Sequence, residues 1–197
     1  MSRLMLLMSL LLVTSGCLGP TAEDKAVEFV ENLGGRVIRD KKLPGKPVIE
    51  VNLNGKQVKD AGLKELAGLK NLTTLYLGGT KVTDAGLKEL SGHKNLVTLS
   101  LIRTKVTDEG LKELAGFKDL NSLNLAITKV TDVGLKELAG LKNLTNLDLS
   151  HTQVTDVGLT ELAGLKNLTD LDMSDTLVTN VGVKELQQAL PKCEIVK

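Results

Sequence analysis

Apolar residues recur along most of this chain in a pattern that repeats every 24 positions. The same order of apolar and polar positions appears six times, in residues 48–71, 72–95, 96–119, 120–143, 144–167 and 168–191. A truncated seventh copy follows at residues 192–197. A period of this length is typical of stacked structural repeats, in which each unit buries its apolar side against its neighbours. Most of the chain is therefore predicted to be a solenoid.

Each repeat is predicted to combine a short strand with a short helix. In the third copy, Leu99 and Leu101 are two positions apart, as expected for the buried side of a strand. Thr107 and Asp108 then supply a helix cap and a carboxylate in the first turn, where the helix dipole favours negative charge. Two leucines on one helical face follow, and Gly116 comes after them, where we expect a left-handed C-terminal cap.

One glycine inside each predicted helix returns in every copy. Glycine in a helix interior costs about 1 kcal/mol relative to alanine, so its regular return needs a physical reason. We expect neighbouring turns to approach closely at this point, where a Cβ atom would collide. The glycines concerned are Gly62, Gly86, Gly110, Gly134, Gly158 and Gly182.

The pattern LxxLxLxxTxVTDxGLxxLxxLxx resembles that of bacterial leucine-rich repeat proteins with 24-residue repeats. Its second half is similar to the cysteine-containing subclass found beside F-box domains. The resemblance implies an α/β horseshoe with a parallel inner sheet, short outer helices and a concave inner face that binds a protein partner. No F-box fits in the segment before the repeats, so a substrate-adaptor role is not expected. Threonines replace the family's asparagine or cysteine and are expected to hydrogen-bond the bends; they are Thr80, Thr104, Thr128, Thr152 and Thr176.

The first residues carry a different pattern. Arg3 precedes a ten-residue apolar run at positions 4–13, and Thr14-Ser15-Gly16-Cys17 follows. The run is too short to cross a hydrocarbon core of about 30 Å as a helix. The layout is that of a secretory signal and resembles a bacterial lipoprotein signal, in which the cysteine carries lipid. We expect a signal peptide at residues 1–16, lipid on Cys17 as the first mature residue, and a short tether at residues 17–20.

This signal predicts an exported protein anchored to a membrane through Cys17. Leu18, rather than an aspartate, follows the cysteine. By analogy with enterobacterial sorting, this residue favours an outer rather than an inner membrane, so we expect the protein at the outer membrane or facing the periplasm. A secreted protein with an ordinary cleaved signal and a retained anchor are the alternatives.

The segment between the signal and the repeats is predicted to cap the solenoid. Residues 21–33 have apolar positions spaced as on one face of a helix, and residues 36–40 have the composition of a strand. An open solenoid end would expose an apolar face and an unpaired strand edge, and a helix with an added strand would cover both. We therefore assign residues 21–47 to an N-terminal cap and residues 192–197 to a C-terminal edge strand.

Composition narrows the class of partner. The formal net charge is +1 and aromatic residues make up 2% of the chain, so there is neither a global basic field nor a set of stacking platforms for bases. Nucleic acid is therefore not an expected partner. Two cysteines, Cys17 and Cys193, are too few for a disulfide framework, so leucine and valine must build the core.

The polar residues that flank the inward leucines should form columns along the inner face of the parallel sheet. Two patches are predicted there. A mixed apolar and basic patch near the middle carries residue types that anchor protein interfaces, namely Tyr76, Ile102, Arg103 and Ile127. An acidic patch lies toward the C-terminus and comprises Asp148, Asp170, Asp172, Asp175 and Glu194, with His151 beside it as a further candidate contact. We expect both patches to contact a protein partner, with no cofactor.

Three other functions are compatible with the same residues. Neighbouring carboxylates of the acidic patch could share Ca²⁺, although a flat sheet is an awkward source of six to eight oxygen ligands. His151 lies near Ser150, Ser174 and Asp175, which suggests a hydrolytic triad, but the sequence marks no strained nucleophile turn or oxyanion hole. An architectural envelope protein that uses the outer surface is the third. We expect a non-enzymatic binding protein rather than an enzyme.

Overall fold

The computed structural model describes residues 19–197. The predicted signal peptide at residues 1–16 and the predicted lipidation site Cys17 lie outside the described residues. Within residues 19–197, none of the helices has the length and apolar character needed to cross a membrane.

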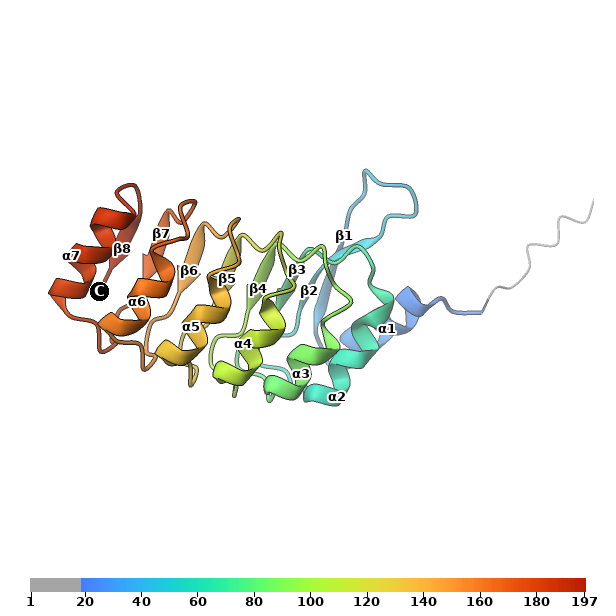
Figure 1. Cartoon of the computed structure of the whole chain (residues 1–197). Helices are drawn as coiled ribbons and strands as arrows, with labels where there is room; N and C mark the ends of the chain where they lie inside the picture. Colours follow the sequence, from blue (N-terminus) through green and yellow to red (C-terminus); the bar gives the residue numbers. More distant parts are fainter. Residues whose placement is uncertain (1–18) are drawn as a thin grey trace, which may run out of the picture.

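One eight-stranded sheet runs along the whole described chain, with its strands in sequence order (Figure 1). From the second strand to the last, neighbouring strands are parallel, and each residue faces the residue 24 positions further on. The first strand is antiparallel to the second. The strands are β1 (Arg36–Arg39), β2 (Val48–Asn52), β3 (Thr74–Tyr76), β4 (Thr98–Ser100), β5 (Ser122–Asn124), β6 (Asn146–Asp148), β7 (Asp170–Asp172) and β8 (Glu194–Val196). The predicted solenoid with a parallel sheet is confirmed.

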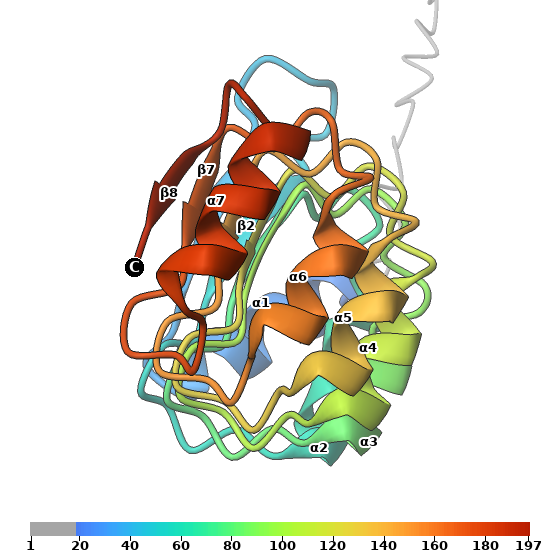
Figure 2. The ribbon, with the colours of Figure 1, turned by 60° about the vertical axis from the view of Figure 1, so that its left-hand side comes forward.

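Short helices form a second layer on one side of this sheet, so each repeat is one strand and one helix (Figures 1 and 2). The helices of the repeats are α2 (Asp60–Leu63) with the 3₁₀ helix η1 (Lys64–Gly68), α3 (Asp84–Glu89), α4 (Asp108–Leu114), α5 (Asp132–Leu138), α6 (Asp156–Leu162) and α7 (Asn180–Ala189). Two rims join the layers. We call the loops that lead from each strand to the next helix the carboxyl rim, and the loops that lead from each helix to the next strand the amino rim. The sheet face that points away from the helices is the inner face.

The core is a stack of equivalent leucines and valines, one layer per repeat. Leu75 and Leu99 are fully buried, and Leu123 is 1% exposed. The threonine at the bend after each strand from β3 to β7 is also buried or nearly so, and its hydroxyl donates a hydrogen bond of 2.6–2.7 Å to the main-chain carbonyl three residues earlier. The first copy has Lys56 at this position. The expected bonding of the bends by threonine is therefore confirmed, and each bond lies within one repeat.

The recurring helix glycines lie where neighbouring repeats approach most closely. A Cβ atom on Gly134 would lie 2.5 Å from Oδ1 of Asp108 in the preceding repeat, and one on Gly158 would lie 2.4 Å from Oδ1 of Asp132. Gly62, in the first copy, faces the ring of Phe29 instead, with Cζ at 3.0 Å. The expected close approach is therefore confirmed.

The expectation of a left-handed cap at Gly116 is wrong. The positive-φ glycines among residues 19–197 are Gly34, Gly45, Gly55 and Gly79. Helix α4 continues right-handed into Ala115, and the N–H of Phe117 then closes a tight turn by donating to the carbonyl of Leu114 at 2.9 Å. This short turn directs the chain toward the next strand without a left-handed residue.

A helix and an antiparallel strand occupy the predicted N-terminal cap. Helix α1 (Ala22–Asn32) begins with a capping box between Thr21 and Asp24, and it buries Ala26 and Val30. Its first turn lies against the end of η1, where a Cβ atom on Gly68 would be 2.1 Å from the carbonyl oxygen of Ala22. Strand β1 pairs with β2, the first strand of the array.

Candidate functional site

The register of the sheet produces the predicted columns on the inner face. Tyr76 of β3 faces Ser100 of β4, and the same column continues through Asn124 and Asp148 to Asp172. The neighbouring column ends with Asp170 opposite Glu194. Asp170 is exposed, whereas Asp148 and Asp172 are half-buried. The structure therefore brings the carboxylates of the predicted acidic patch onto adjacent strands.

Two of these carboxylates also shape the backbone. Oδ1 of Asp148 accepts hydrogen bonds from the main-chain N–H and the hydroxyl of Ser150, at 3.0 and 2.7 Å. Oδ1 of Asp172 accepts from the N–H of Ser174 at 2.8 Å. Such bonds to the residue two positions on are typical of Asx turns, which aspartate forms readily. Asp148 and Asp172 thus fix the turn that ends each strand, a role that the sequence analysis missed.

A row of left-handed residues follows these turns on the carboxyl rim. Arg103, Ile127, His151 and Asp175 have φ angles of 53°, 56°, 54° and 55°. The first two repeats place Gly55 and Gly79 at the equivalent position, with φ of 69° and 67°. The left-handed conformation costs a non-glycine residue roughly 1–2 kcal/mol, and it is rare for a β-branched side chain such as isoleucine. Four consecutive repeats therefore keep a side chain where glycine is favoured.

Hydrogen bonds between repeats hold this conformation. The main-chain N–H of Arg103 donates to the carbonyl of Ala126 at 2.9 Å, and that of Ile127 donates to Ser150 at 2.9 Å. The N–H of His151 donates to Ser174 at 2.8 Å. These bonds extend the parallel ladder to the third residue beyond each strand. The left-handed row is thus a continuation of the sheet, with its side chains at fixed spacing.

The side chains of this left-handed row are open to solvent. Ile127 is 37% exposed, and Arg103 is exposed beside it. Nε2 of His151 lies 3.4 Å from Oδ2 of Asp175, with both side chains more than half exposed. An exposed pair of this kind contributes little to stability. Its place in the row leaves both side chains accessible to a partner.

The hydroxyl of Ser150 donates to Asp148 rather than to His151, and Ser174 is bonded to Asp172 through its main-chain N–H. Within residues 19–197 neither serine hydroxyl is hydrogen-bonded to His151, so the suggested triad is not assembled. Residues 19–197 also contain no group of three or more His, Cys, Asp or Glu side chains arranged to hold a metal ion. A shallow groove of about 190 Å³ does cross strands β5 to β7 on the inner face. Its polar lining includes Asn124, Asp148, Asp170 and Asp172. The mixed patch around Tyr76 lies outside this groove.

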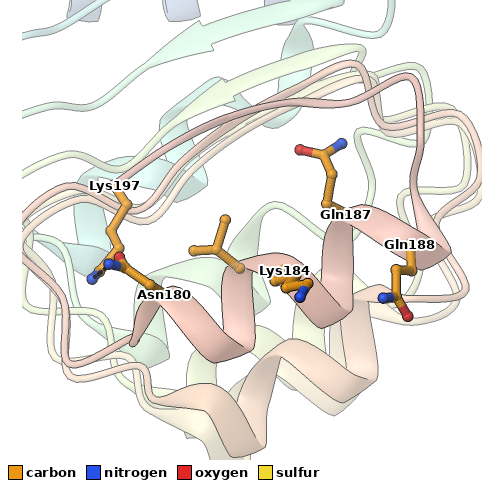
Figure 3. Close-up of a pocket in the computed structure, with 6 residues that line it drawn as sticks. Asn180, Lys184, Gln187, Gln188 and Lys197 are labelled. Carbon is orange, nitrogen blue, oxygen red and sulfur yellow. Dashed lines mark hydrogen bonds between the residues drawn. The ribbon is translucent and has the colours of Figure 1, made fainter.

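A larger hollow lies at the C-terminal end of the solenoid, away from the inner face. It has a volume of about 460 Å³ and is lined by residues of α7 and by Lys197 (Figure 3). Val183, whose equivalents in earlier repeats are buried leucines, is only half-buried here. Nζ of Lys197 donates to Oδ1 of Asn180 at 2.8 Å. This hollow therefore lies beside the last helix of the described stack rather than among the predicted site residues.

Two titratable groups are buried away from the inner columns. His93 is 4% exposed, and burial lowers the pKa of its imidazole below the usual range. Cys193 is also 4% exposed; burial, with the nearby charge of Asp170, raises the pKa of its thiol to about 11. Both groups are therefore neutral at physiological pH.

Comparisons with known proteins agree with this architecture. Family models described as leucine-rich repeats match residues 68–91, 92–115 and 142–187. No curated protein sequence is significantly similar to the chain. An internalin C2 from Listeria monocytogenes is similar in structure, with a TM-score of 0.60 and 23% identity, over 90% of this chain and 84% of the internalin. A second Listeria monocytogenes internalin, InlF, has a TM-score of 0.56 and 19% identity, over 90% of this chain but 56% of its own. The chain thus contains leucine-rich repeats, and the predicted fold is confirmed.

Proposed function

We propose that this chain is a non-enzymatic module that binds a protein partner through its inner face and the adjoining left-handed row. The main support for this proposal is the left-handed row. Arg103, Ile127 and His151 adopt the left-handed conformation at a position where the first two repeats have glycine. Side chains kept at energetic cost in a strained conformation cluster at functional sites. Here they form one exposed line beside the sheet.

The mixed patch supplies the anchors of the proposed interface. Tyr76 and Arg103 belong to the residue types that most often dominate binding energy, and Ile102 and Ile127 add apolar surface next to them. Ile102 lies over Gly78, where a Cβ atom would be 2.6 Å from its Cγ2. We expect this patch to bury aromatic and apolar surface of the partner.

The acidic patch selects the charge of the partner. Asp170 and Asp175 are exposed, and Asp148 and Asp172 are half-buried beside them. Negative surface of this kind accelerates association with a positively charged surface and disfavours acidic ones. The partner is therefore expected to place basic residues against β6 and β7.

Envelope anchoring forms part of the proposal. The apolar run at positions 4–13 and the Ser15-Gly16-Cys17 sequence support a lipid on Cys17, and with it an exported protein attached to a membrane. The intact mass of the mature protein tests this point. A Cys17→Ser variant should remain unprocessed or leave the membrane fraction, whereas an unmodified soluble wild-type chain would contradict the anchor.

Crosslinking and affinity capture from native envelopes, followed by binding measurements with the captured protein, test the interface. Truncation of an anchor, as in Tyr76→Ala or Arg103→Ala, is expected to weaken binding by about 2 kcal/mol or more. The double variant Asp170→Lys/Asp175→Lys should slow association at low salt and matter less at high salt. Glu161→Lys/Glu185→Lys, on the helix side, is the matched control with the same change of charge. Unchanged binding by all inner-face variants would overturn the proposal.

A further inference from the structure

The amino rim carries a concentration of positive charge that the whole-chain value conceals. The formal net charge of the chain is +1, yet nine exposed lysines lie on the loops of this rim, whose acidic residues are Asp40 and Asp119. The adjoining first turn of α1 adds the carboxylates of Glu23 and Asp24. Five of the lysines occupy the same position of successive repeats, just before the loop asparagine or aspartate. The nine are Lys41, Lys42, Lys46, Lys70, Lys94, Lys118, Lys142, Lys166 and Lys192.

Sheet topology explains why these lysines share one rim. The strands from β2 to β8 are parallel, so every loop that enters a strand lies at the same edge of the sheet. Asparagine side chains tie successive loops together: Nδ2 of Asn143 donates to the carbonyl of Lys118 at 2.9 Å, and Nδ2 of Asn167 to that of Lys142 at 2.7 Å. The hairpin between β1 and β2 projects from this edge, as does the loop from α7 to β8 (Figures 1 and 2).

Several of these side chains are held along the rim. Nζ of Lys142 donates to the carbonyl of Gly164 at 3.2 Å, and Nζ of Lys166 donates to that of Ala189 at 3.0 Å. Nζ of Lys94 lies 5.6 Å from the centre of the Phe117 ring. Each contact reaches the end of the next helix while the lysine stays exposed. The ammonium groups therefore form a regular line rather than a set of independent charges.

The segment before the described residues joins the molecule at this rim. Helix α1 begins at Ala22, and its first turn lies against Gly68, at the end of η1 and the start of an amino-rim loop. The described chain therefore begins, at Gly19, beside the first lysines of the line, two positions after the predicted lipidation site Cys17 in the sequence. A lipid on Cys17 would bring this end of the rim to a bilayer.

We propose that the amino rim rests on an anionic lipid surface, with its lysines against phosphate headgroups. Lysines near a negatively charged leaflet are attracted to it within about a Debye length, roughly 8 Å at physiological salt. One lipid anchor combined with a basic surface also holds a protein more firmly than either alone. The strands then run away from the membrane, and the carboxyl rim with Arg103 and His151 faces outward. This inference goes beyond the proposed function, because the partner site lies on other surfaces.

Vesicle binding of the full chain tests the inference. The probes are vesicles of phosphatidylcholine alone and of phosphatidylcholine mixed with phosphatidylglycerol. The rim variant changes five lysines to glutamine: Lys70, Lys94, Lys118, Lys142 and Lys166. The matched control changes five lysines of the helix layer, with the same loss of charge: Lys64, Lys88, Lys112, Lys136 and Lys184. We expect partition to anionic vesicles to fall about tenfold or more in the rim variant, and by less than about twofold in the control.

The rim variant could also affect folding, because Lys142 and Lys166 donate hydrogen bonds to the ends of helices. A second variant avoids this effect. Lys41→Gln/Lys42→Gln/Lys46→Gln alters the hairpin, remote from those helix ends, and should weaken anionic-vesicle binding in the same direction. Equal losses in the rim and helix variants would overturn the inference, as would equal binding to neutral and anionic vesicles. Binding to a soluble polyanion such as heparin without binding to vesicles would also overturn it. Because all variants share the same N-terminus, the comparison of the rim and hairpin variants with the helix variant does not depend on lipid at Cys17 or on the protein partner.

Discussion

The carboxylate of Asp84 accepts two hydrogen bonds from Thr107 of the following repeat, one from the main-chain N–H and one from the hydroxyl, both 2.8 Å long. Asp84 lies in the first turn of α3, and Thr107 is the N-cap of α4. Five such links join successive helices along the carboxyl rim: Asp60–Thr83, Asp84–Thr107, Asp108–Thr131, Asp132–Thr155 and Asp156–Thr179. The bonds from Thr179 hold the pKa of the Asp156 carboxyl below its usual value. The helix glycines make room for these carboxylates.

Breaking one of these links should destabilise the stack. Asp108→Ala removes acceptors at 2.8 and 2.7 Å from Thr131 and leaves its N–H without this partner. Hydrogen bonds to charged groups contribute about 1.5–3 kcal/mol, so we expect a loss in that range in urea unfolding. Lys136→Ala, on the exposed helix surface, should change stability by less than about 0.5 kcal/mol. Equal effects of the two substitutions would contradict the linking role.

The helix glycine should be far less tolerant of a methyl group than the glycine that follows the same helix. In Gly134→Ala the new Cβ would lie 2.5 Å from Oδ1 of Asp108, whereas in Gly140→Ala it would meet only the flexible end of Lys118, at 3.2 Å. We expect a loss of about 1–3 kcal/mol for Gly134→Ala, as for other overpacked sites. Gly140→Ala should stay within about 0.5 kcal/mol of wild type. Thermal melting of both variants compares them directly.

Strain at Ile127 can be measured by comparing two truncations. Ile127→Ala and Ile127→Gly both remove the side chain beyond Cβ, but only glycine adopts the left-handed φ of 56° without steric cost. The glycine variant should therefore be more stable than the alanine variant by roughly 1–2 kcal/mol. In an ordinary helix or strand the order would be reversed. Both variants lack the isoleucine side chain and should bind the partner more weakly than wild type. Ile127→Gly should therefore weaken binding while it relieves strain in the fold.

Burial of His93 should make stability depend on pH. The folded protein has a lowered His93 pKa, so below about pH 6.5 the unfolded chain takes up a proton more readily than the folded one. Stability is then fully present above this pH and falls as the pH decreases through the folded pKa. His93→Leu, which restores the residue type of Leu69 and Leu141, should reduce the loss between about pH 7.5 and about pH 5.5. If chemical denaturation showed the same pH dependence of stability in His93→Leu as in wild type, other groups would cause the loss at low pH.

The fold was predictable because apolar residues at equivalent positions of successive repeats have the same environment. A period of 24 places Leu99 and Leu123 opposite each other, and with a parallel register it also places Asn124 beside Asp148. The columns of the inner face could therefore be written down from the sequence. The helix ends were less predictable, because Gly116 is compatible with a left-handed cap but the chain uses a tighter turn.

The candidate site was only partly predictable, because its main feature is a backbone conformation. Gly55 and Gly79 are compatible with a left-handed position, but Ile127 at the same place in the repeat carries no such signal, and the row was not predicted. The Asx turns of Asp148 and Asp172 had a visible pattern, an aspartate two residues before a serine. The hydrogen bonds between Asp108 and Thr131 join two different repeats. They depend on the distance between neighbouring helices, which the sequence of one repeat does not reveal.

The most direct test of the inner-face interface is site-specific photocrosslinking in native envelopes. A photoreactive residue at position 127 is compared with one at position 157, where Val157 is 71% exposed on the helix side. Helix-side valines offer exposed apolar surface of their own, so position 157 is a demanding control. We predict a discrete adduct with a partner protein from position 127 and none from position 157. An adduct from position 157 alone would contradict the proposed inner-face interface and assign the partner to the helix layer.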